Sequence, residues 1–147
     1  MESLRDRTVL LVEDDPDDAK VVELAFERSG FDAGLRIVQN AEEATAYVSG
    51  LGPFVDRVQF PQPALILLDM NLPGRSGLQF VQWLRQREDS RIVPVIALTG
   101  VVDYELIKKA FAAGVNSYIQ KPHDFPELES AIKLLLKYWL VLSAPPK

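Results

Sequence analysis

The chain has 147 residues, a length that favours one domain with a hydrophobic core of its own. Hydrophobic residues make up 48% of it and charged residues 25%, which excludes a disordered polypeptide. The net charge of −5, the lack of cysteine and the single histidine, His123, argue against nonspecific nucleic-acid binding, thiolate or disulfide chemistry, and a histidine-rich metal cluster.

Neither end of the chain has the features of a targeting or membrane segment. The first seven residues lack the apolar stretch of a signal peptide. The longest C-terminal apolar stretch, 132–142, is interrupted by Lys133 and Lys137 and is too short to span a bilayer. We therefore expect a cytoplasmic protein that does not contact membranes.

Strand and helix patterns alternate five times along the chain. A run of aliphatic residues at 8–12 predicts a buried strand, and Asp15 and Pro16 then suit the start of a helix. In chain order, we expect this helix to end near Ser29, a strand at 35–38, a helix capped by Asn40, a loop at 50–63, a strand ending at Asp69, a helix from Ser76 to about Ser90, a strand at 94–98, a helix at 103–113, a strand at 117–120, and a helix from about Phe125 to beyond Tyr138. Continuous apolar strands between amphipathic helices predict an α/β fold, with helices on both faces of a parallel sheet.

Asp69 is the residue that most constrains the function. It ends a continuous apolar run and is followed by a Pro73-Gly74 turn, so a buried strand delivers its carboxylate to the edge of the sheet. A carboxylate in such a place has to be solvated, paired or bound to a ligand.

Four of the five expected strands end at a chemically useful side chain. These side chains are Glu13 and Asp14, then Asp69, Thr99 and Lys121. Because parallel strands have all their carboxyl ends on one edge, we expect the five residues to converge. A hard cation such as Mg²⁺ offsets the repulsion of three acids, and a lysine suits a phosphoryl oxygen. The set predicts phosphoryl transfer onto a carboxylate.

Four segments together resemble the receiver domains of two-component response regulators. They are Val12–Pro16, Leu68–Gly74 with Gly77, Ala97–Gly100 and Ser117–Pro122. The resemblance covers about residues 8–138. It implies a flavodoxin-like five-stranded parallel sheet of order 2-1-3-4-5, and one receiver domain over 1–147 with a tail at 139–147 and no output domain.

The resemblance also implies a role for each site residue. Asp69 would take a phosphoryl group from a partner sensor histidine kinase, without the protein being an enzyme beyond assisting this transfer and its own dephosphorylation. Mg²⁺ would be held by Asp14, Asp69, the backbone carbonyl of Asn71, and Glu13 directly or through water. Lys121 and Thr99 would contact the phosphoryl group, and Tyr118 would move inward in response.

The C-terminal stretch 134–142 is apolar on nearly every helical face, although a surface helix needs only one apolar stripe. The surplus predicts a protein interface, most simply of a homodimer, formed by Leu135, Tyr138, Trp139 and Leu142. The alternative is that this stretch folds back on its own domain. The tail and the loop at 50–63 make the chain similar to regulators paired with bacterial phytochromes, so the kinase would be a bacteriophytochrome.

Two other classes of protein fit less well. A haloacid-dehalogenase-like, Mg²⁺-dependent phosphatase also phosphorylates an aspartate, but it needs an acid two residues later, where this chain has Asn71. A dinucleotide-binding fold needs a glycine-rich loop after the first strand, where this chain has acids.

Overall fold

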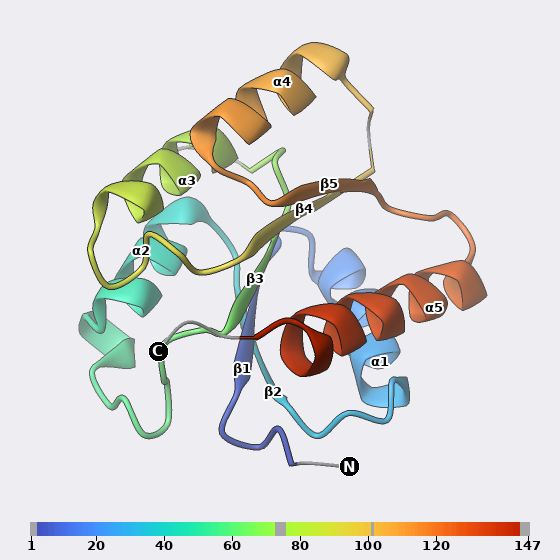
Figure 1. Ribbon diagram of the computed structural model, residues 1–147, viewed down its shortest axis with the longest axis horizontal. Helices are drawn as coiled ribbons and strands as arrows, with labels where there is room; N and C mark the ends of the chain where they lie inside the picture. The colour runs from blue at the N-terminus through green and yellow to red at the C-terminus, as the bar shows by residue number, and fades with distance from the viewer. Residues whose placement is uncertain (1–2, 73–75, 101, 145–147) are drawn as a thin grey trace.

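The computed structural model describes residues 3–72, 76–100 and 102–144. Five parallel strands form one twisted sheet in the order β2-β1-β3-β4-β5, with helices on both faces (Figure 1). The strands are β1 (Thr8–Val12), β2 (Gly34–Val38), β3 (Leu65–Leu68), β4 (Val95–Thr99) and β5 (Ser117–Gln120). The predicted fold class and strand order are confirmed.

Five α-helices alternate with the strands. They are α1 (Pro16–Arg28), α2 (Ala41–Ser49), α3 (Gly77–Gln86), α4 (Tyr104–Ala113) and α5 (Phe125–Leu136). Asp15, Asn40 and Ser76 cap the first three through their side chains, as the sequence predicted. Within the described residues, no helix is long and apolar enough to cross a membrane.

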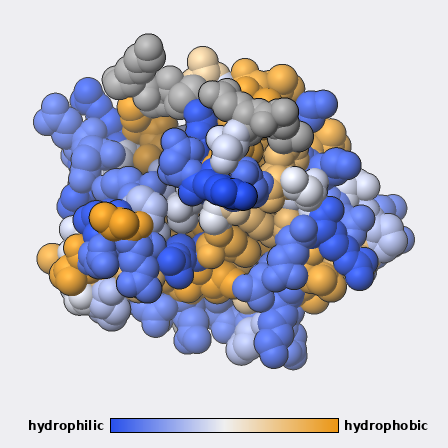
Figure 2. All heavy atoms as spheres, turned by 90° about the horizontal axis from the view of Figure 1, so that it is seen from below, coloured by the Kyte–Doolittle hydropathy of each residue, from blue (hydrophilic) through white to orange (hydrophobic). Residues whose placement is uncertain are grey.

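The sheet separates two hydrophobic clusters. Val9 and Leu11 of β1 face the side covered by α1 and α5, whereas Leu10 and Val12 face the side covered by α2, α3 and α4. Because successive side chains of a strand point to opposite faces, a strand covered on both sides must be apolar throughout. This explains the unbroken apolar runs. Figure 2 shows hydrophobic residues reaching the surface between hydrophilic ones on the face seen from below.

The loop at 50–63, for which the sequence suggested no role, covers the end of α2. Phe54 and Phe60 pack on the ring of Tyr47, with centroids 5.0 and 6.0 Å away. The guanidinium of Arg57 donates to the carbonyls of Tyr47 and Val48 over 2.7 and 3.2 Å, and these carbonyls lie in the last turn of α2, where few helical amides remain to pair with them. The loop is therefore an ordered cap built from aromatic rings and one arginine.

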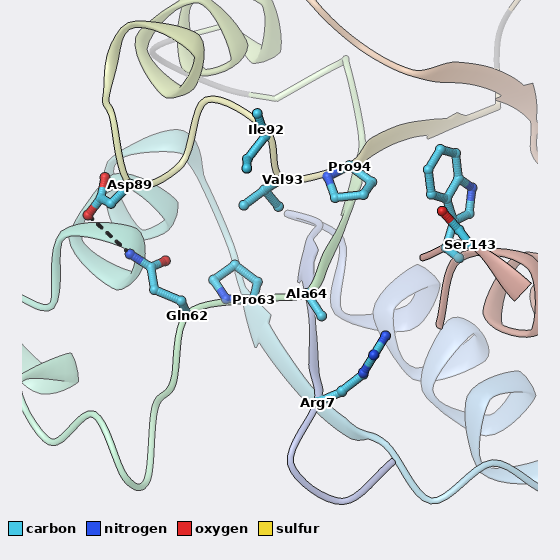
Figure 3. A pocket seen from close by; sticks show the side chains of 10 residues that line it. Arg7, Gln62, Pro63, Ala64, Asp89, Ile92, Val93, Pro94 and Ser143 are labelled. Atoms are coloured by element: carbon cyan, nitrogen blue, oxygen red, sulfur yellow. Dashed lines mark hydrogen bonds between the residues drawn. The ribbon is translucent and has the colours of Figure 1, made fainter. Parts of the chain in front are cut away.

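The chain continues from α5 into a π-helical segment, Lys137–Leu142. Leu140 is buried in this segment, and its carbonyl accepts a hydrogen bond of 3.0 Å from Arg7. Trp139 packs against the cluster on the α1–α5 side and lines a cavity of about 340 Å³ at the amino-terminal edge of the sheet. Figure 3 shows Arg7 and Ser143 toward one end of this cavity and the hydrogen-bonded pair Gln62 and Asp89 at the other.

Candidate functional site

The carboxyl ends of β1, β3, β4 and β5 meet at the opposite edge of the sheet, as the topology predicted. The amide of Asp69 donates to the carbonyl of Val12 over 3.0 Å, and the amide of Lys121 donates to Thr99 over 2.7 Å. These bonds continue the ladders of the sheet by one step, so they fix the backbone of the residues that carry the chemistry. A cavity of about 460 Å³ opens here, lined by Asp18, Val21, Asp69, Asn71, Thr99, Gly100, Lys121, Pro122, His123 and Leu128.

Three carboxylates form a cluster beside this cavity. Glu13, Asp14 and Asp69 each place one oxygen within 4.8 Å of the other two. Glu13 is only 3% exposed, whereas Asp14 lies at the surface and Asp69 is half-buried. Burial raises the pKa of the Glu13 carboxyl, and the nearby Asp69 adds to the rise against the opposing effect of Lys121. The cluster is thus a site of concentrated and partly buried negative charge.

Lys121 follows the end of β5, and its side chain contacts the Glu13 carboxylate of this cluster. Its ammonium lies 2.9 Å from Glu13 Oε1 and 3.8 Å from Asp18 Oδ2. Burial acts to lower the pKa of Lys121, but the hydrogen bond and charge of Glu13, with smaller contributions from Asp18 and Asp69, raise it overall. The ammonium therefore stays protonated at neutral pH and is available to an anion bound at Asp69.

The donor set of the acidic cluster fits Mg²⁺. All its ligands are oxygens, and Mg²⁺ prefers one or two protein carboxylates together with water. One Lys121 ammonium cannot balance three carboxylates, and a divalent cation would offset the repulsion from Asp69 that adds to the effect of burial on the pKa of Glu13. Glu13, Asp14 and Asp69 are the residues that would hold it. Asn71 lies beside them, and its amide donates to Asp69 Oδ1 over 2.9 Å.

Thr99 and Tyr118 occupy neighbouring strands. Thr99 ends β4, is buried, and lines the cavity. Tyr118 pairs with Ala97 in the register of β4 and β5 and packs partly against the cluster on the α2–α4 side. Burial raises the pKa of Tyr118, with further effects from Asp103 and Asp69. The predicted turn at Pro73-Gly74 lies outside the described residues.

Two titratable residues that line the cavity, His123 and Asp18, were not assigned to the site from the sequence. His123 is exposed, as its loop position suggested, but it also lines the cavity. Asp18 lies in the first turn of α1 and faces Lys121. The signal for Asp18 was available, because a helix that begins directly after the acids of β1 must place its first turn over the same edge of the sheet.

The residues predicted for a C-terminal interface divide into two pairs. Leu135 is 9% exposed and belongs to the protein's own core, and Trp139 packs against that core. Tyr138 and Leu142 are 51% and 67% exposed. Leu135 is therefore not the surface residue that the sequence suggested, because it lies on the face of α5 that packs on the sheet. Residues 134–142 thus partly fold back on the domain and still expose apolar side chains to solvent.

The fold, the convergent acids and the lysine define a phosphoacceptor regulator. Residues 9–133 match the response regulator receiver domain family, and the chain belongs to this family. It is a phosphoacceptor response regulator.

Its relatives include response regulators, and two similar crystal structures are described as those of a regulator in red light signalling and of a phytochrome response regulator. Response regulator Rcp1 of Synechocystis is 29% identical over 139 residues, which cover 95% of this chain and 92% of Rcp1. The structure is also similar to the crystal structure of response regulator RPA3017 in red light signalling of R. palustris, with a TM-score of 0.89. The two sequences are 35% identical, and the match covers 96% of this chain and 99% of that one. The phosphorylated cyanobacterial phytochrome response regulator RcpA is 26% identical, with a TM-score of 0.87 over the same shares.

Proposed function

We propose that Asp69 accepts a phosphoryl group from a sensor histidine kinase in a Mg²⁺-dependent step, and that the modification switches a protein-interaction surface. The observation that supports it most directly is the convergence of three carboxylates and Lys121 on one cavity. In the transfer, the P–N bond of a phosphohistidine breaks, a P–O bond forms to Asp69, and the imidazole nitrogen keeps the electron pair. Bound Mg²⁺ would neutralise charge on the carboxylates and the phosphoryl oxygens.

The residues around Asp69 bind the phosphoryl group and respond to it. Lys121 pairs with a phosphoryl oxygen, and the Thr99 hydroxyl donates to another. Because Tyr118 lies on the next strand and is half-buried, it follows Thr99 inward and carries the change to the surface formed by α4, β5 and α5. The similarity to the bacteriophytochrome response regulators RtBRR and AtBRR, which are 36% and 28% identical to this chain, supports a bacteriophytochrome as the kinase.

The affinity for Mg²⁺ will fall as the pH is lowered from about 7 to about 5. Protons and the metal compete for the same carboxylates, and Glu13 binds its proton above the usual value of 4.5, so its protonation begins earlier than that of an ordinary glutamate. Calorimetric titration with Mg²⁺ across this range measures the effect. Glu13→Gln will bind Mg²⁺ more weakly and with a shallower pH dependence. A dissociation constant that is unchanged across the range would contradict a role for Glu13.

The surface proposed to switch is the outer side of α5 and the π-helical segment, where a homodimer would form. Its exposed apolar residues are Leu134, Tyr138, Val141 and Leu142. A shallow groove beside them is lined by Ser117, Ile119, Ala131, Leu134, Leu135, Tyr138 and Trp139. Tyr138 packs edge-on against Trp139 at 5.0 Å, so the core holds an aromatic residue in place at the surface.

Size-exclusion chromatography with light scattering will show a dimer in the presence of Mg²⁺ and beryllofluoride, and Leu142→Asp will shift it to monomer. The added carboxylate would have to be buried without a partner in the interface. Val58→Asp makes the same change at an exposed residue of the loop at 50–63 and leaves the dimer intact. A wild-type protein that is monomeric with and without the phosphoryl analogue would rule out the dimer.

A further inference from the structure

Lys121 has a second carboxylate neighbour, Asp18, that the acidic cluster does not need. Asp18 lies in the first turn of α1, where its amide donates to the capping Asp15 side chain over 3.3 Å. Its Oδ2 lies 3.8 Å from Lys121 Nζ, and it lines the same cavity as Asp69. It is not one of the three carboxylates that meet in the cluster.

The two carboxylates around Lys121, Glu13 and Asp18, differ in whether they would also bind the metal. Glu13 is the closer partner, at 2.9 Å, and it is also one of the acids that would hold the metal. A metal held at the cluster would offset the charge of Glu13, and Asp18 would then remain as the carboxylate that still attracts Lys121. The phosphoryl group on Asp69 needs the same ammonium, so the two anions compete for one cation.

We propose that Asp18 is a positioning residue that competes with the phosphoryl group for Lys121 and thereby limits how tightly the activated state is held. The proposal rests on the function proposed above. Asp18 is 53% exposed on its side chain, so solvent screens its interaction and the competition is moderate. Its charge also acts with opposite sign on the two ligands, because it attracts Mg²⁺ toward the cavity and opposes the anion.

The test compares Asp18→Asn with Asp17→Asn. Asp17 carries the same charge in the same first turn of α1 but is not part of the cavity lining, which makes it a matched control. Two dissociation constants are measured by calorimetry for each protein, one for Mg²⁺ alone and one for beryllofluoride at saturating Mg²⁺. In Asp18→Asn, beryllofluoride will bind about threefold more tightly and Mg²⁺ about twofold more weakly, as an exposed ion pair allows.

Opposite changes in the two dissociation constants distinguish competition from a structural effect, because a disturbed α1 would weaken the binding of both ligands. Asp18→Glu keeps the charge and will return both constants to near the wild-type values. The inference is overturned if Asp18→Asn has the dissociation constants of the wild type or binds both ligands more weakly. It is also overturned if Asp17→Asn shows the same opposite changes. Failure of the proposed function looks different, because the wild type would then not bind beryllofluoride with Mg²⁺, or would bind it equally well as Asp69→Asn.

Discussion

Replacement of Asp69 by asparagine will abolish phosphoryl uptake. An amide has no carboxylate oxygen with which to attack phosphorus, whereas its carbonyl oxygen can still accept the 2.9 Å hydrogen bond from the amide of Asn71. The loss should therefore be close to complete, with the surrounding loop unchanged. Intact mass measurement after incubation with Mg²⁺ and a phosphorylated kinase, or with acetyl phosphate, follows the addition directly.

Unfolding will not explain this loss, because the substitution removes a repulsive charge. Asp69 is among the groups that raise the pKa of Glu13, so the variant relieves an unfavourable contact between two carboxylates. Its thermal midpoint without metal will equal or exceed that of the wild type. Asp17→Asn, which changes an acid outside the cavity lining, should keep full uptake. Phosphorylation of Asp69→Asn at the wild-type level would place the acceptor elsewhere.

Replacement of Arg85 by alanine will produce a large loss of stability. The guanidinium, on α3, donates five hydrogen bonds, which go to four acceptors. Gly114 O accepts two, at 2.7 and 3.0 Å, and Val93 O accepts one at 2.7 Å. Arg91 O and the Asn116 side chain each accept one at 3.0 Å. One side chain thus ties α3 to the segments that enter β4 and β5.

We expect the free energy of unfolding to fall by about 3 kcal/mol in Arg85→Ala, because several partly buried carbonyls lose a charged donor at once. Arg85→Lys should recover only part of the loss, since an ammonium cannot match the planar fork of a guanidinium. Urea unfolding followed by circular dichroism measures both. Arg91→Ala, at an exposed neighbouring position, should cost less than about 0.5 kcal/mol. Equal losses in the Arg85 and Arg91 variants would contradict the assigned role.

Much of the fold and of the site could be predicted from local sequence patterns. Asp15, Asn40 and Ser76 cap their helices through bonds to residues two or three positions later, so neighbouring residues alone specify where these helices begin. The convergence of Asp69 and Lys121 followed from parallel topology, because a strand that runs into the core must bring its last residue to the shared edge.

The tertiary structure decided the features that depend on partners distant in sequence. Leu135 faces the core while Tyr138 faces solvent, and a stretch that is apolar on every face gives no signal to choose between them. Arg85 donates to the carbonyl of Gly114, 29 residues away, and Lys121 donates to Glu13, 108 residues away. The partner of a long, flexible side chain is whichever suitable group the fold brings close to it, and local sequence patterns do not show which group that is.

The sequence by itself therefore determined the parallel sheet and the acids and lysine that meet at one edge, and its resemblance to receiver domains implied the strand order. The structure added how the charges are shared: Glu13 holds Lys121 most closely, and Asp18 stands beside it as a second counter-ion. The physical reason is that secondary structure and hydrophobic burial follow from the pattern of residues that are neighbours in the sequence. Electrostatic pairing depends instead on distances of a few ångströms between residues that only the complete fold brings together.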